Sequence, residues 1–197
     1  ARLCESLPLE LSLTSAMDAL SHALEAIWNK NENERSDELA IRGIGLIVPA
    51  LDSLSEPVDL DVRRQLLLGS HLAGLAFSNT STAAAHSISY PLTAHFGIPH
   101  GIACSMPLRP LMEINGSSVR SKLDRLFSHL GVAGSDELWS WVERSLTGKV
   151  GFRLREYGVA RGDLGWLKDE CFTKGRMDNN IVGLDSDDVT AVLDAIF

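Results

Sequence analysis

Two side chains that can bind a metal ion lie four residues apart in the segment Asp18-Ala-Leu-Ser-His22. If the segment is helical, this spacing places a carboxylate and an imidazole on one face, one turn apart. Their neighbours are small or apolar, so both groups are expected to be partly buried and to need polar partners. The segment alone leaves two interpretations open, a shared metal ion or a helix-capping aspartate beside a hydrogen-bonded core histidine.

Two more histidines have similar surroundings. His86 lies in AAAHSISYP, within a predicted helix of small residues, and His100 lies in GIPHG, at the start of the next helix. Each one alone also suits a hydrogen-bonded core position. Together with Asp18 and His22 they form a nitrogen and oxygen ligand set suited to Fe²⁺, Zn²⁺ or Mn²⁺. The competing metal motifs HExxH, CxxC and Glu-x-x-His are absent from the sequence.

Composition indicates an ordinary globular chain of 197 residues, with 45% hydrophobic and 22% charged residues. The net charge of −8 and the lack of a basic stripe argue against nucleic acid as a partner. No apolar run approaches the ~18 residues of a membrane span, and the first residues do not resemble a signal peptide. Cys4, Cys104 and Cys171 are widely spaced, which favours a reducing, cytoplasmic compartment.

Helical periodicity dominates from Thr14 onwards, so we expect an all-α fold that positions these side chains. Pro49 is expected to kink or end the second helix, the third is expected to be central, and the fourth should not pass far beyond Pro91. Pro107 and Pro110 are expected to interrupt the fifth. The helices are predicted at residues 14–28, 36–54, 62–77, 81 to about 91, 102–114, 119–130, 136–146, 161–171 and 186–197.

Two segments resemble the metal-binding region of iron-containing (group III) alcohol dehydrogenases: SAMDALSHALEAIW and LLLGSHLAGLAFSNTSTAAAHSISYPLTAHFGIPHGIACSMPL. The resemblance implies that Asp18, His22, His86 and His100 are the metal ligands, with Fe²⁺ as the metal and Zn²⁺ as the alternative. It is strongest over residues 15–113, and FTKGRMDNNIVGLDSDDV still resembles the closing helices of the family. It also implies that residues 1–197 form a multi-helix bundle like the helical domain of dehydroquinate synthase.

The same resemblance implies a metal-dependent, NAD(P)-linked alcohol dehydrogenase or aldehyde reductase, and by analogy a homo-oligomer. The family's N-terminal Rossmann-like nucleotide domain is expected to be missing, because no GxGxxG follows a predicted strand, so the chain alone should be inactive. The alternatives are a zinc polyol dehydrogenase, a dehydroquinate synthase or a maleylacetate reductase. A non-catalytic helical metal-binding domain, or histidines that bind no metal, are further alternatives.

One position departs from the family pattern. Tyr90 stands where the family usually has a second histidine, one turn after the third ligand, so Tyr90 and His95 are the candidate catalytic groups for proton transfer. The segments EAIWNKN and FTKGRMDNN are similar to phosphonoacetaldehyde reductases within the family, which suggests a small anionic aldehyde as substrate. Cations that could bind its anionic group are Arg109, Arg153, Arg155, Lys174 and Arg176.

Overall fold

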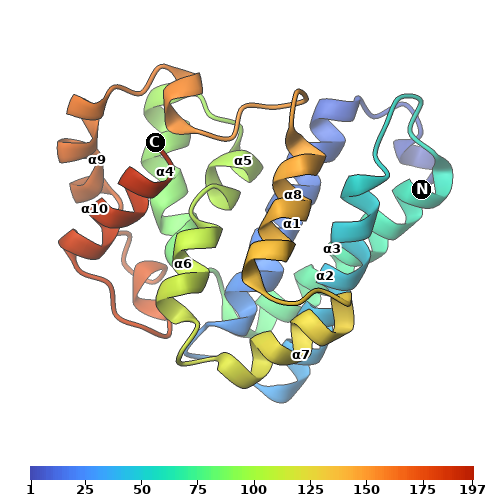
Figure 1. Ribbon diagram of the computed structural model, residues 1–197, viewed down its shortest axis with the longest axis horizontal. Helices are drawn as coiled ribbons and strands as arrows, with labels where there is room; N and C mark the ends of the chain where they lie inside the picture. The colour runs from blue at the N-terminus through green and yellow to red at the C-terminus, as the bar shows by residue number, and fades with distance from the viewer.

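The computed structural model describes residues 1–197 and confirms the all-α fold, with a single isolated β-bridge between Asn29 and Asn180 (Figure 1). The α-helices are α1 (Leu9–Ile27), α2 (Glu34–Asp52), α3 (Leu60–Thr80), α4 (Ala84–Phe96), α5 (His100–Ser105), α6 (Leu108–Asn115), α7 (Arg120–Leu130), α8 (Ser135–Leu146), α9 (Leu164–Glu170) and α10 (Ser186–Ala195). Short 3₁₀ helices lie at Arg2–Cys4, Leu154–Tyr157, Arg161–Asp163 and Met177–Asn179.

Helix α1 is the centre of the fold. It packs against α2, α3, α4 and α5, and from Leu13 to its end only a few of its side chains reach solvent. Met17, Leu20 and Leu24 are among the largest wholly buried side chains of the protein. Its polar face, which carries Asp18 and His22, is therefore held inside a rigid apolar frame.

Helices α2 and α3 pack against each other and against α1, on the side of the molecule opposite α9 and α10 (Figure 1). The first helix of the pair begins with a capping box between Asn33 and Ser36, and it continues through Pro49 to Asp52. The two helices cross closely at Gly43 and Gly69. A Cβ at Gly43 would lie only 3.1 Å from the carbonyl oxygen of Gly69.

The prediction that the third helix is central is wrong. Its apolar side chains Leu67, Leu68 and Leu75 are 41%, 51% and 41% exposed, and α1 occupies the centre instead. When apolar residues occur all around a helix, the sequence alone does not show whether the helix is buried on every side or on one side only. The sequence of α3 therefore predicted a helix correctly but not its environment.

The segment that carries His86 and His100 folds as two helices joined by a tight turn. Contrary to expectation, α4 continues five residues past Pro91 and ends at Phe96, followed by Gly97, whose φ of 63° suits glycine. Only one backbone hydrogen bond is lost at a proline, and the burial of Ile88 and Leu92 on the same helix offsets it. The expected interruption at Pro107 is present, because α5 ends at Ser105 and α6 starts at Leu108, whereas Pro110 lies within α6 and does not interrupt it.

The C-terminal third follows the predicted helices closely. The expected helix at 161–171 is divided into a 3₁₀ turn, Arg161–Asp163, and α9, while α10 starts after a capping box formed by Asp185 and Asp188. No helix of the structure combines the length with the apolarity that a membrane crossing requires.

Candidate metal centre

Three of the four predicted ligands converge where α1, α4 and α5 meet. Oδ1 of Asp18 lies 3.7 Å from Nε2 of His86 and 3.8 Å from Nε2 of His100. These atoms, with the sulfur of Cys104, all lie within 4.8 Å of one another. Side chains separated by as many as 86 positions in the chain thus form one compact group of metal-donor atoms.

His22 lies beside this group but is not one of its members. Its Nδ1 is 3.8 Å from Oδ2 of Asp18, the carboxylate oxygen other than the one that faces His86 and His100. Its ring is stacked between Phe77 and His86, with centroid separations of 4.2 and 4.6 Å. The ligand role of His22 therefore stays a prediction.

Glu25 is a buried group that the sequence analysis missed. Its side chain is wholly buried, and its Oε2 lies 2.6 Å from Nδ1 of His86. The carboxylate also accepts hydrogen bonds from the backbone N–H groups of Ala83, Ala85 and His86, at 2.9, 2.6 and 3.2 Å. Because α4 has no local side-chain cap, Glu25 of α1 both caps that helix and orients the His86 ring.

The spacing of Asp18, His22 and Glu25 is the signal that could have identified Glu25. Positions i, i+4 and i+7 fall on one stripe of a helix, so all three side chains face α4 and α5. An acidic residue that is buried in the protein core needs a partner. Here the partner is His86, and the stripe continues the polar face that starts at Asp18.

Helix α5 approaches α1 closely enough to bring His100 to Asp18. A Cβ added at Gly101 would overlap the carbonyl oxygen of Thr14 and would come 3.0 Å from Cβ of Asp18. Only glycine fits this contact, so Gly101 sets the distance between the two helices. His100 stays 46% exposed at the first turn of α5, whereas His86 is only 4% exposed.

Cys104 lies one turn after His100 on α5 and is wholly buried. Its sulfur is 3.5 Å from Nε2 and 3.7 Å from Nδ1 of His100. The sequence analysis treated this cysteine only as an indicator of the redox compartment. The four-residue spacing from His100, which is the spacing that selected Asp18 and His22, could have placed it in the site.

Electrostatic coupling within the group shifts the pKa values of its members. Burial lowers the pKa of His86, but the Glu25 carboxylate and the nearby Asp18 and Cys104 outweigh burial and raise that pKa to about 12. Burial raises the pKa of Asp18, and its histidine neighbours overcome this and lower it. The pKa of Cys104 is lowered by His100 and His86 despite burial, which favours the thiolate.

Two buried polar atoms at the centre of the group have no hydrogen-bond partner, Oδ1 of Asp18 and Nε2 of His86. Unpartnered buried polar atoms are rare in folded proteins because each costs the free energy of its desolvation. Both atoms point into the group of donors, and the donor set of carboxylate, imidazole and thiolate matches Fe²⁺ or Zn²⁺ chemistry. The residues present therefore fit a divalent transition-metal ion.

The two candidates for proton transfer have different surroundings. The Tyr90 ring is stacked against His100 with a centroid distance of 6.4 Å, and its hydroxyl accepts a hydrogen bond from Nε of Arg176 at 3.4 Å. His95 instead pairs with Glu170, at 2.7 Å, and contacts the edge of Trp166. The structure thus brings Tyr90, but not His95, to a metal-donor residue.

The cations predicted for substrate binding are also dispersed. Only Arg176 contacts the site, through Tyr90. Arg109 and Arg153 both lie within 3.7 Å of the carboxylate of Glu143, in a different part of the protein, and Arg109 is also 3.1 Å from Asp136. Their charges are already partnered.

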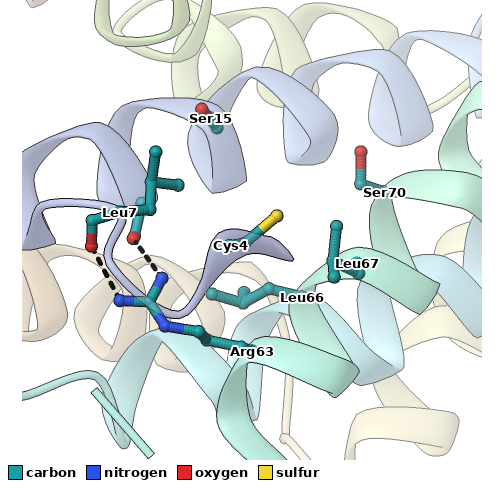
Figure 2. Close-up of a pocket in the computed structure, with 8 residues that line it drawn as sticks. Cys4, Leu7, Ser15, Arg63, Leu66, Leu67 and Ser70 are labelled. Atoms are coloured by element: carbon teal, nitrogen blue, oxygen red, sulfur yellow. Dashed lines mark hydrogen bonds between the residues drawn. The ribbon is translucent and has the colours of Figure 1, made fainter. Parts of the chain in front are cut away.

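A separate pocket lies between the N-terminal segment, α1 and α3 (Figure 2). Arg63 of α3 is buried at this pocket and donates hydrogen bonds to Oγ of Ser12 and to the carbonyl oxygen of Leu7, and Leu66 and Leu67 of the same helix also line it. None of the residues that line this pocket belongs to the group of donor atoms formed by Asp18, His86, His100 and Cys104. It therefore does not extend the candidate metal centre.

Comparison with known proteins gives a consistent result. Residues 12–197 match the family model described as the Fe-containing alcohol dehydrogenase family, C-terminal. Long-chain-alcohol dehydrogenase 1 of Geobacillus thermodenitrificans is 34% identical over 145 residues, which are 73% of this chain and 36% of that protein. Maleylacetate reductase 1 of Rhodococcus opacus is 31% identical over 134 residues, 68% of this chain and 38% of that protein.

The fold is also that of solved structures. The sulfoacetaldehyde reductase of Bifidobacterium kashiwanohense, in complex with NAD⁺, superimposes with a TM-score of 0.89 at 24% identity and covers 99% of this chain. The matched region is 52% of that protein. The chain thus spans between about a third and a half of the length of these relatives.

Proposed function

Because the chain belongs to the Fe-containing alcohol dehydrogenase family, through the C-terminal region of that family, we propose that it is the metal-binding half of an NAD(P)-dependent enzyme that interconverts a small alcohol and its aldehyde. The observation that carries this proposal is the convergence of Asp18, His86 and His100, with two unpartnered buried atoms at its centre. Relatives of the chain are dehydrogenases and reductases, which supports the same reaction class.

Asp18, His22, His86 and His100 would hold the metal, with Fe²⁺ as the first candidate and Zn²⁺ as the second. A cation bound there supplies Lewis-acid polarisation of the alcohol or carbonyl oxygen, and the nicotinamide supplies the hydride chemistry. Glu25 acts as a positioning residue, because its contact with Nδ1 of His86 directs Nε2 of that ring toward the other donors.

Tyr90 is the residue that we assign to proton transfer to or from the substrate oxygen. Its hydroxyl lies at the end of a ring stacked on His100, and Tyr90 as a residue is 37% exposed, so the side chain can meet a substrate and solvent. Nε of the Arg176 guanidinium donates a hydrogen bond to this hydroxyl at 3.4 Å and fixes its position. His95, held by Glu170, stays the second candidate.

An aldehyde with an anionic group, such as phosphonoacetaldehyde, is the proposed substrate class, and Arg176 is the residue that supports it. In the full-length protein, Arg176→Gln should raise KM for phosphonoacetaldehyde about tenfold, which corresponds to ~1.4 kcal/mol of binding. KM for butanal should not change, and Arg153→Gln should leave both values unaltered. Equal efficiency with both aldehydes in the unmodified enzyme would contradict this substrate class.

A Rossmann-like nucleotide domain is proposed to precede residue 1 in the complete protein, and the cytoplasmic location and homo-oligomeric state stay predictions. The direct experiment follows NAD(P)H oxidation by the full-length protein with small aldehydes. Activity that is lost in His100→Ala supports the proposal. No Rossmann-like segment upstream in the open reading frame, together with no activity, would favour the alternative of a non-catalytic metal-binding domain.

A further inference from the structure

A short arch of the chain, residues 172–176, carries Arg176 to the edge of the candidate metal centre. The arch lies between Cys171 and Met177, which are 0% and 6% exposed and therefore anchor its two ends in the core. Backbone N–H groups of Arg176 and Met177 both donate hydrogen bonds to the carbonyl oxygen of Thr173, at 3.1 Å each. The arch is thus a compact turn between two buried residues.

Helix α4 contacts the arch at two places on one face. Ser87 and Tyr90 are three residues apart, so their side chains point to the same side of the helix. The Ser87 side chain is wholly buried, and its hydroxyl donates a hydrogen bond to the carbonyl oxygen of Cys171 and accepts one from the N–H group of Thr173. One turn later, Tyr90 accepts a hydrogen bond from Nε of Arg176. One face of α4 therefore holds both the inner end of the arch and its cation.

Asn179 attaches the arch at its other end. Its Nδ2 donates hydrogen bonds to the carbonyl oxygen of Thr82, 2.8 Å away in the turn before α4, and to that of Gly175, 3.0 Å away in the arch. Gly175 has a φ of 75°, which favours glycine, and it turns the chain directly before Arg176. The arch is thus tied to α4 at one end and to the preceding turn at the other.

The Arg176 guanidinium is held in place by uncharged groups. Its Nε donates to the Tyr90 hydroxyl and its Nη1 to the carbonyl oxygen of Gly175, at 3.4 and 2.9 Å. Arg109, in contrast, lies 3.7 Å from the carboxylate of Glu143. A guanidinium that is fixed but not neutralised can bind an oxyanion through two parallel N–H groups, and the strength of that contact depends on its exact position.

We propose that Ser87 is a positioning residue for substrate specificity, which holds the arch so that Arg176 meets the anionic group of the substrate. This proposal rests on the proposed function, because it requires an aldehyde with a phosphonate or similar oxyanion. Ser87 lies inside the protein and does not touch the substrate. Its loss removes the bridge between Cys171 and Thr173, so the guanidinium keeps its charge and loses its fixed position. The effect therefore cannot exceed that of removing the guanidinium.

Binding of methylphosphonate, which carries the anionic group without the aldehyde, measures this effect apart from turnover. Isothermal titration calorimetry of the full-length, metal-loaded protein gives its Kd. Ser87→Ala should raise this Kd about three- to tenfold, and by no more than Arg176→Gln does. Ser145→Ala removes another buried hydroxyl, which donates to the carbonyl oxygen of Trp141 within α8, and it should leave the Kd unchanged.

A double-mutant cycle separates positioning from a general loss of structure. Ser87→Ala/Arg176→Gln should bind methylphosphonate no more weakly than Arg176→Gln alone, because the hydroxyl has no guanidinium left to position. In turnover, Ser87→Ala should lower the ratio of kcat/KM for phosphonoacetaldehyde to kcat/KM for butanal by a similar factor, mainly through KM. Asn179→Ala, which removes the second attachment, should act in the same direction and provides the test if Ser87→Ala does not fold.

The outcomes separate this proposal from the proposed function. If Arg176→Gln raises the Kd but Ser87→Ala and Asn179→Ala do not, or if the effects of Ser87→Ala and Arg176→Gln multiply, the positioning role is overturned and the substrate class stands. Equal losses with both aldehydes, or loss of the metal in Ser87→Ala, would show a general structural role and also overturn it. If Arg176→Gln itself leaves the Kd unchanged, both the substrate class and the positioning role are contradicted.

Discussion

The carboxylate of Glu25 lies 2.6 Å from Nδ1 of His86, although the two residues are 61 positions apart and belong to different helices. The same carboxylate accepts hydrogen bonds from three backbone N–H groups at the start of α4. One buried side chain of α1 thus fixes both the position of α4 and the direction in which its histidine presents Nε2. The stability of the fold and the geometry of the site are coupled at this residue.

Replacement of this carboxylate should weaken metal binding more than it weakens the fold. Glu25→Gln retains the shape and one acceptor oxygen but removes the charge that orients His86, so metal affinity is expected to fall about 10–100-fold. Competition with a chromophoric chelator measures this affinity. Glu38→Gln, which removes an exposed acidic group from α2, is the matched control. Equal affinities in Glu25→Gln and in the unmodified protein would exclude the positioning role.

A methyl group at Gly101 should separate α5 from α1. Because the added Cβ would overlap the Thr14 carbonyl oxygen, Gly101→Ala is expected to cost about 1–3 kcal/mol of unfolding free energy and to move His100 away from Asp18. Urea denaturation and metal content measure the two effects. Gly165→Ala, on α9 with no atom near the added methyl, should retain the metal and be neutral or slightly stabilising. Full metal content in Gly101→Ala would show that the contact is not needed.

Tyr90→Phe should reduce turnover of the full-length enzyme without loss of metal. The hydroxyl is the only group removed, so a decrease in kcat of about 10²-fold is expected if it transfers the proton. His95→Gln is the competing variant, and its effect should be within about twofold because His95 contacts Glu170 and Trp166 instead of a metal donor. A large loss in His95→Gln with none in Tyr90→Phe would reverse the assignment.

The buried thiol of Cys171 should make the free energy of unfolding depend on pH, independently of the metal centre. Burial, with a contribution from Glu170, raises the pKa of this thiol from 9.0 to about 12. The folded state keeps the proton while the unfolded state loses it, so this residue's contribution to the free energy of unfolding is complete below pH 9.0 and is lost as pH rises to about 12. The slope is up to ~1.4 kcal/mol per pH unit.

The comparison of unmodified protein with Cys171→Ala isolates that contribution from other groups that titrate in alkali. Under reducing conditions, urea denaturation at one pH below 9.0 and one between 9.0 and 12 gives two differences in unfolding free energy. The advantage of the unmodified protein should shrink at the higher pH. An advantage that stays constant would mean that this thiol titrates normally.

Local sequence rules predicted most of the fold. Helix existence followed from 3.6-residue periodicity, and the boundaries moved by only a few residues in most cases. These rules were misleading where tertiary packing decides which side chains are buried and where a helix ends. Leu67 and Leu75 of α3 are apolar but half exposed, and Pro91 lies inside a helix that its packed neighbours stabilise.

The candidate site was predictable where one helix carries two donors, and less so where donors meet across helices. The spacing of Asp18 and His22 placed both donors on one helix face, and the small or apolar surroundings of His86 and His100 made them candidates, but no sequence rule places Glu25 against His86 across 61 positions. Cys104 was missed because a lone cysteine has no motif of its own. His95 looked equivalent to Tyr90 in sequence, yet the turn at Gly97 follows it directly and its ring contacts α9.

Metal stoichiometry is the most direct test of the central claim that Asp18, His86 and His100 hold one ion. The protein is purified anaerobically and its iron and zinc are measured by elemental analysis, in parallel with Asp18→Asn/His100→Ala and with His71→Ala, an exposed histidine on α3. The two altered ligands are 31% and 46% exposed, so the double variant should fold, which circular dichroism verifies. We expect about one iron or zinc per chain in the unmodified protein and in His71→Ala, and none in the double variant. The same metal content in all three, or none in the folded unmodified protein, would contradict the account.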